Sequence, residues 1–153
     1  MHEHINRLLA DFGNALGLQD LALDDKGYCC LSFDELLVNI EAVGDSALVL
    51  LYSSVGVLPA DAAPEIYRSL LDANYFFQGT AGATVGLDLA AGTVALTRVV
   101  DTHGVQVLDW EGIIQGFVEA AESCARRLSG PDGAATQGPG WEAWAPAARE
   151  GRP

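Results

Sequence analysis

Residues 64–88 read PEIYRSLLDANYFFQGTAGATVGLD, and within this stretch a helical pattern gives way to a strand pattern. Apolar residues at helical spacing form one stripe, which consists of Ile66, Leu70, Ala73 and Phe77. Asp61 stands where its side chain can cap the helix, and Pro64 falls in the first turn, where a missing N–H is harmless. Gly79 and Gly82 end the helix, and the strand is predicted to follow them.

The residues before this stretch predict one helix and three strands. An amphipathic pattern with its apolar residues on one face runs from the N-terminus to Gly17. Three apolar segments follow between short polar breaks, at residues 28–33, 36–43 and 47–55. Residues 36–43 alternate with period two, and Gly44-Asp45-Ser46 is typical of a hairpin turn. The sequence therefore predicts an antiparallel three-stranded meander.

The residues after the stretch predict a second hairpin and a last helix. Segments 84–89 and 93–100 flank an Ala-Gly turn, and residues 105–108 are either a short extension of that sheet or a loop. The last helix has Asp109 as its predicted cap and this apolar stripe: Trp110, Ile113, Ile114, Phe117, Ala121, Cys124 and Leu128. The predicted order is α-β-β-β-α-β-β-α, an α+β fold with a twisted antiparallel sheet packed against helices.

The chain is predicted to hold one domain and a tail. A length of 153 residues suits a single domain of ordinary size. Periodic patterns cover residues 1–130, whereas residues 131–153 are rich in Gly, Ala and Pro and show no helical or strand period. We therefore expect a domain over 1–130 and a flexible tail over 131–153.

The charge of the chain excludes several classes of partner. Its 8 basic and 21 acidic side chains give a net charge of -13, which repels phosphate backbones and anionic lipid. Neither nucleic acid nor a membrane is therefore expected to bind, and no apolar run reaches the length that spans a bilayer. The three cysteines form no disulfide framework, which favours a reducing cytoplasm.

A search for catalytic and metal-binding patterns finds no constellation. Metal-ligand spacings are absent, and the serines lack the pattern of a nucleophile elbow. Cys29 and Cys30 are adjacent on a predicted strand, so their side chains point apart. His103 precedes a glycine in a predicted exposed turn, and a single turn histidine gives little support for catalysis. We predict that the chain is not an enzyme and uses no metal or cofactor.

The chain has more apolar residues than a small α+β domain needs. Residues 47–51 are apolar on both faces of their strand, and the second helix is apolar on more than one side. One explanation is a well-packed central strand and a helix buried in its own core. The other is homodimerisation together with a groove for a partner peptide, because exposed apolar patches mark interaction sites.

A family signature lies within the stretch quoted first. Leu70-Leu71-Asp72-Ala73-Asn74 and Gly82-Ala83-Thr84-Val85-Gly86-Leu87-Asp88 resemble the LLEAN and GGATLGLD segments of the class I type III secretion chaperones, the Tir chaperone (CesT-like) family. The element order and low pI are similar to that family as well, and the resemblance covers about residues 1–130. The tail with Trp141 and Trp144 has no counterpart in the family pattern.

The resemblance implies a function and a set of contact residues. It implies a cytoplasmic homodimer that holds the N-terminal region of a secreted effector in extended, export-competent form without ATP. By this resemblance we assign the dimer interface to Ile66, Leu70, Ala73 and Phe77. We assign effector binding to Leu8, Phe12, Leu37, Val49 and Leu51.

Two other functions fit the same composition. The first is a regulatory or scaffold interaction domain of the same fold without secretion cargo, which only the identity of the bound protein would distinguish. The second is an enzyme that binds a small ligand in the sheet groove. A closed apolar pocket with a perturbed titratable group would favour the enzyme, and long shallow grooves on a dimer would favour the chaperone.

Overall fold

The computed structural model describes residues 2–130, and the predicted tail lies outside these residues. The element order is as predicted, with one additional turn of 3₁₀ helix after the second helix. The elements are α1 (Glu3–Ala15), β1 (Tyr28–Phe33), β2 (Leu36–Ala42), β3 (Leu48–Val57), α2 (Pro64–Asn74), η1 (Tyr75–Phe77), β4 (Thr84–Asp88), β5 (Thr93–Asp101) and α3 (Val107–Leu128). The α+β fold predicted from the sequence is confirmed.

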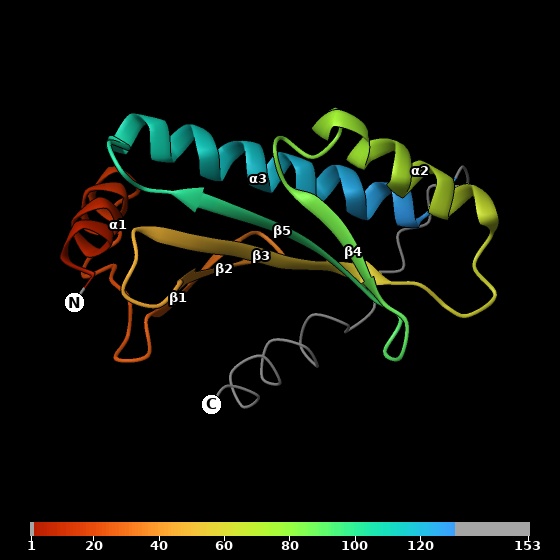
Figure 1. Ribbon diagram of the computed structural model, residues 1–153, viewed down its shortest axis with the longest axis horizontal. Coiled ribbons are helices and arrows are strands. Elements are labelled where there is room, and N and C mark those ends of the chain that lie inside the picture. Colours follow the sequence, from red (N-terminus) through yellow and green to blue (C-terminus); the bar gives the residue numbers. More distant parts are fainter. Residues whose placement is uncertain (1, 131–153) are drawn as a thin grey trace.

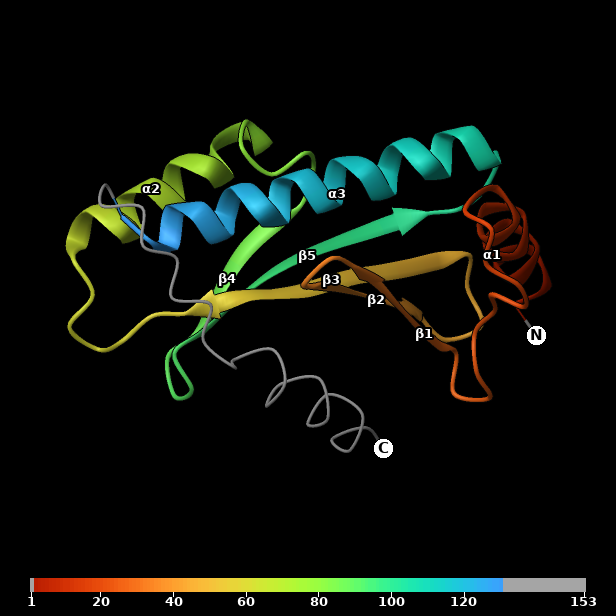
Figure 2. The same cartoon turned by 180° about the vertical axis from the view of Figure 1, so that it is seen from behind.

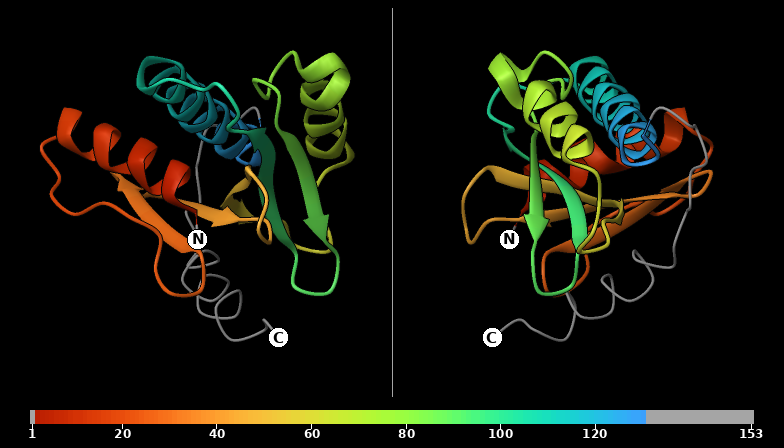
Figure 3. Two further views of the ribbon diagram at one scale, coloured as in Figure 1. Left: turned by 60° about the vertical axis from the view of Figure 1, so that its left-hand side comes forward. Right: turned by 90° about the vertical axis from the view of Figure 1, so that its right-hand side faces the viewer.

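The five strands form one antiparallel sheet in the order β1-β2-β3-β5-β4. The helices lie on one face of this sheet, with α2 beside α3 and α1 at the other end of α3 (Figures 1 and 2). Two further views show the same arrangement from the ends of the sheet (Figure 3). No helix among residues 2–130 covers the opposite face, which we call the open face.

The position of β3 between β2 and β5 explains why both faces of this strand are apolar. Val49 and Leu51 are buried beneath the helices, and Leu51 pairs with the buried Ile40 of β2. Leu48 and Leu50, one residue out of phase, point to the open face because side chains alternate along a strand. The predicted strand therefore uses one apolar row for the core and leaves the second row outside it.

Helices α1 and α3 close the core over this face. The helix α1 buries Ile5, Leu8, Leu9 and Phe12, at the spacing that the sequence predicted. The helix α3 buries the largest side chains of the core, Trp110 and Phe117. Because this core contains residues from all three helices and from β1, β2, β3 and β5, with Val85 and Leu87 of β4 packed against it, residues 2–130 fold around one hydrophobic centre.

The structure corrects three local predictions. Residues 105–108 are neither strand nor wholly loop, because α3 already begins at Val107. Asp109 is therefore not the residue before the helix; it lies in the first turn and accepts a hydrogen bond from the backbone N–H of Gln106 at 3.0 Å. Asp61 does not cap α2, which begins after Ala63 without a side-chain cap.

Candidate functional site

One group of large apolar side chains is exposed where α2 ends. Leu71 is 69% exposed and Phe76 is 78% exposed, and Tyr75 and Phe77 are exposed beside them. We call these four residues the α2–η1 surface. The rings of Tyr75 and Phe76 contact each other edge to face, with centroids 4.7 Å apart. An exposed cluster of this kind is typical of a protein-interaction site.

Backbone geometry keeps these aromatic rings outside the core. Phe76 and Phe77 have φ values of 48° and 58°, in the left-handed region that bulky residues rarely adopt. Such strain persists where the surroundings impose it, and it is concentrated at functional sites. The two residues turn the chain sharply after α2, so their side chains do not continue the buried stripe of the helix.

Asn74 fixes this turn to the sheet. Its side-chain N–H donates to the backbone oxygen of Val85 at 3.1 Å, and its side-chain oxygen accepts from the backbone N–H of Val85 at 2.8 Å. This double hydrogen bond joins the end of α2 to β4, the edge strand. Asn74 and β4, which both belong to the segment that resembles the family signature, are therefore joined by this pair of hydrogen bonds. The pair holds the α2–η1 surface beside the edge of the sheet.

Arg127 of α3 holds α2 from the other side. Its guanidinium donates from Nη1 to the backbone oxygen of Ser69 at 2.8 Å and to the Ser69 hydroxyl at 2.9 Å. The Asp72 carboxylate lies 3.9 Å from the same nitrogen. A Cβ atom added to Gly79 would lie 3.0 Å from Cα and Cβ of Ala73 and 3.1 Å from Arg127 Nη2, so glycine lets the turn approach both α2 and the guanidinium closely. Arg127 thus connects α3 to α2 and lies against the turn behind η1.

The predicted dimer residues fall on two sides of α2. Leu70 and Ala73 are buried within the chain, and Ile66 is half-buried against the core. Phe77 alone of the four is exposed, on the α2–η1 surface. Leu71 and Tyr75, which lie four residues apart beside the predicted stripe, and the adjacent Phe76 are not among the contact residues predicted from the sequence. The three consecutive aromatic residues after Asn74 are a signal in the sequence, since neighbouring residues of a helix cannot all face the core.

The predicted effector-binding residues are mostly inside the protomer. Leu8, Phe12, Val49 and Leu51 are buried in the core between helices and sheet, so a partner cannot reach them in this conformation. Leu37 is half-buried on the open face, where it pairs with Ser32 of β1. The structure therefore brings the four core residues together as packing, and it places Leu37 apart from them.

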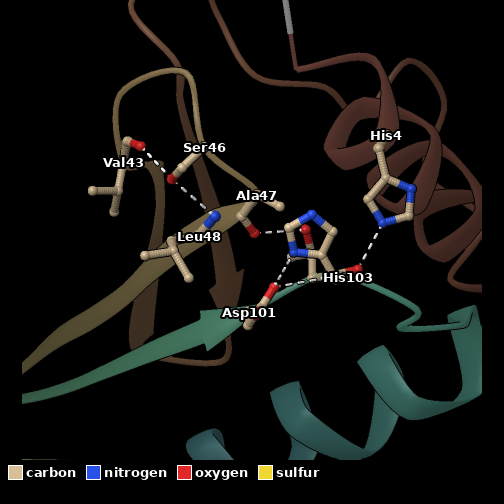
Figure 4. A network of polar contacts seen from close by, with 8 residues as sticks. His4, Val43, Ser46, Ala47, Leu48, Asp101 and His103 are labelled. Carbon is tan, nitrogen blue, oxygen red and sulfur yellow. Dashed lines mark hydrogen bonds and ion pairs between the residues drawn. The ribbon is translucent and has the colours of Figure 1, made fainter.

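A polar network anchors α1 to the end of the sheet (Figure 4). His4 Nε2 lies 2.7 Å from the backbone oxygen of Thr102, and the Thr102 hydroxyl donates to the backbone oxygen of Ala47 at 2.7 Å. Beside them His103 Nδ1 lies 2.7 Å from an oxygen of Asp101. The backbone N–H of His103, followed by its side chain, lowers the pKa of the Asp101 carboxyl below its usual value.

Two of the three thiols, those of Cys29 and Cys124, show no sign of activation. Burial, followed by the nearby Cys30 and Asp24, raises the pKa of Cys29 to about 11. Burial also raises the pKa of Cys124. Both thiols are therefore protonated at neutral pH, which is the unreactive form. Within residues 2–130 no three His, Cys, Asp or Glu side chains gather to hold a metal ion, and no helix is long and apolar enough to span a bilayer.

Comparison with protein-family models matches residues 7–125 to the Tir chaperone protein (CesT) family. A search of curated proteins finds no match. Among solved structures, a chain of the ExsC–ExsE complex is 26% identical, with a TM-score of 0.64 over 80% of this chain and 91% of that chain.

Two further solved structures share the fold at lower identity. One is a chain of the heterodimeric ExoU–SpcU complex from the type III secretion system of Pseudomonas aeruginosa, with 19% identity, a TM-score of 0.61, and coverage of 82% of this chain and 95% of that one. The other is a chain of the Yersinia pestis structure of the type III secretion chaperone SycH with a fragment of YscM2. It is 17% identical, with a TM-score of 0.60 over 76% of this chain and 95% of that one.

Proposed function

The chain belongs to the Tir chaperone protein (CesT) family of effector-binding type III secretion chaperones, and we propose that it holds the N-terminal region of a secreted effector in extended, export-competent form. The family match over residues 7–125 is the observation that carries this function. We further propose that the chaperone acts in the bacterial cytoplasm, and that it catalyses no reaction. The protonated state of two of its three thiols is consistent with a non-catalytic role.

An extended segment needs a large surface in order to bind usefully. Ordering a chain that has little structure of its own costs conformational entropy, and only a wide contact area offsets that cost. Within residues 2–130 of one protomer, two apolar regions lie outside the core, the α2–η1 surface on the helix side and the apolar row of β3 on the open face. We propose that the first forms a homodimer and that the second contributes to cargo binding.

The α2–η1 surface supports a homodimer more directly than the buried stripe of α2 does. Leu71 and Phe76 are exposed, and apolar side chains of this size are stabilised when a partner removes them from water. They lie beside β4, an edge strand in which the Asn74 side chain pairs with the backbone N–H and oxygen of Val85. Leu70 and Ala73, assigned to the interface from the sequence, support it from behind by packing α2 onto the domain.

Replacement of Leu71 tests the dimer. Leu71→Asp places a charge in the proposed interface, so we expect light scattering to give a mass near 16.1 kDa in place of twice that value. Leu108→Asp is the matched control, because Leu108 is 75% exposed at the other end of the helical layer and its replacement should leave the dimer intact. A dimer that survives Leu71→Asp removes this interface.

Deletion of the gene in the native bacterium tests the chaperone function. We expect one or a few secreted proteins to disappear from the culture medium while their transcripts remain. Purification of the chaperone should then recover the N-terminal region of one of the same proteins, with two chaperone chains for each cargo chain. An unchanged set of secreted proteins would contradict the proposal and would favour a regulatory or scaffold role for the same fold.

A further inference from the structure

An apolar patch lies on the open face at the β2–β3 turn. Leu50 of β3 stands opposite Val99 of β5, and Leu48 lies in the next row on the same face. Val99 is 60% exposed, Leu48 and Leu50 are half-buried, and Val43 is exposed where β2 ends, two residues after the open-face residue Glu41. We call these four residues the open-face patch. No helix among residues 2–130 covers it (Figure 3).

Two exposed carboxylates lie beside this patch. Asp101 stands opposite Leu48 in the strand register. Asp45 adds an exposed carboxylate in the turn that joins β2 to β3. The close view of this end of the sheet shows Val43, Leu48 and Asp101 around the same turn (Figure 4). The patch is thus apolar at its centre and acidic at its rim.

None of the described strands places a positive side chain on the same face. Among the described strand residues the single cation is Arg98, and it pairs with the buried Leu51, so it points toward the helices. The Asp101 side chain is 61% exposed, and the hydrogen bonds that lower its pKa keep it ionised at neutral pH. Its partner His103 supplies these bonds from the same turn and leaves the carboxylate open to solvent.

We propose that the open-face patch binds a cargo segment in which apolar residues alternate with, or are flanked by, lysine and arginine. The apolar centre of the patch takes the apolar side chains, and the acidic rim takes the basic ones. This inference rests on the proposed chaperone function and specifies which segments of a cargo would be held. The carboxylates also disfavour acidic segments, because charges of like sign would be brought together during docking.

Electrostatic complementarity makes a measurable prediction about salt. Exposed charge pairs are screened, so raising NaCl from about 0.1 M to about 1 M shortens the screening length from about 10 Å to about 3 Å. Apolar contacts do not weaken in this way, since salt does not screen them. A basic apolar segment should therefore bind more weakly at high salt but retain part of its affinity.

Three labelled peptides of about nine residues, the length of a long strand, provide the probes. One alternates leucine and lysine, the second leucine and glutamate, and the third serine and lysine. By fluorescence anisotropy with the full chain, we expect the leucine–lysine peptide to bind at least about tenfold more tightly than either of the others. Equal binding of the serine–lysine peptide would mean that charge alone attracts it, and would overturn the proposal.

A charge-matched pair of variants locates the binding. Val99→Lys adds a positive charge in the open-face patch, whereas Leu89→Lys adds the same charge at a residue that is 86% exposed in the β4–β5 turn. We expect Val99→Lys to weaken leucine–lysine binding by at least about tenfold and Leu89→Lys to change it by less than about twofold. Asp101→Asn, which removes one rim charge with little change in shape, should reduce both the affinity and its salt dependence.

The outcomes separate this inference from the proposed function. If Val99→Lys and Leu89→Lys bind the leucine–lysine peptide equally, the segment docks elsewhere and the inference fails. If the secreted proteins in the medium are then also unchanged in a strain carrying Val99→Lys, the chaperone function stands without this patch. Loss of those secreted proteins only on gene deletion would likewise assign cargo binding to another surface.

Discussion

Helices α3 and α2 lie side by side on the same face of the sheet and use their apolar residues differently. The helix α3 buries Trp110, Phe117 and Cys124 completely, because the sheet, α1 and α2 surround it. The helix α2 lies at the margin, against α3 and β4, and it buries only Leu70 and Ala73. Two amphipathic helices of one small domain therefore differ: α3 stabilises the protomer, whereas α2 with η1 leaves exposed the apolar surface for which we propose a second chain as partner.

Truncation of a fully buried ring of α3 should have the largest effect. Phe117→Ala removes a ring with no exposed surface and leaves a cavity, so we expect the free energy of unfolding to fall by about 3–5 kcal/mol. Urea denaturation followed by circular dichroism measures this loss. Because the ring stabilises a single protomer, the loss should be the same at low and at high protein concentration.

Phe76→Ala is the counterpart on the α2–η1 surface. This ring is exposed in the protomer, so its truncation creates no cavity and should affect unfolding only through association. The difference from wild type should therefore grow with protein concentration and vanish on dilution. A concentration-independent loss for Phe76→Ala, as large as that of Phe117→Ala, would show that the two helices are not different in the way described.

The sequence predicts the helices and strands well because hydrophobic periodicity and turn-forming residues are local properties of the chain. The stripe of α3, from Trp110 to Leu128, and the alternation of residues 36–43 are sufficient for the helix and the strand. Helix starts are less well determined, since Asp109 is a good residue both before a helix and within its first turn. The place of Asp109 within the first turn, three residues after Gln106, follows from the backbone of the folded chain and not from the residue type.

The sequence predicts the surfaces less well because apolar periodicity does not say what covers each face. Val49 and Leu50 are equally apolar, yet Val49 is buried and its neighbour faces the open side. Leu70 and Leu71 differ in the same way, one buried and the other exposed. The left-handed backbone of Phe76 decides where the aromatic rings point, and no residue preference indicates such a conformation for phenylalanine.

Removal of the connection between the two helices should have an intermediate effect. Arg127→Ala deletes two hydrogen bonds from a guanidinium to Ser69, and we expect a loss of about 1–3 kcal/mol in the free energy of unfolding. Hydrogen exchange resolves where the loss occurs. Backbone amides of α2 should exchange faster, whereas those around Phe117 should keep their protection, because α3 is fixed by the core.

Arg126→Ala provides the control for Arg127→Ala. Arg126 precedes it in α3, carries the same charge and is exposed. Its replacement removes the same charge from the same end of the helix dipole, so both variants share that small contribution. If Arg126→Ala accelerates exchange in α2 as much as Arg127→Ala does, the contact with Ser69 is not what holds α2 in place.

The smallest effect should come from the helix starts, where the two helices also differ. The helix α3 begins with the Asp109 carboxylate accepting from the N–H of Gln106, whereas α2 begins after Ala63 without a side-chain cap. Asp109→Ala should therefore cost about 0.5–2 kcal/mol in thermal or urea unfolding, as losses of helix caps do. Asp61→Ala, at the residue that sequence alone assigns as the cap of α2, should change stability by less than about 0.5 kcal/mol. An equal loss in the free energy of unfolding for both variants would mean that Asp61 caps α2 in solution. The N-termini of α2 and α3 would then be stabilised to the same extent.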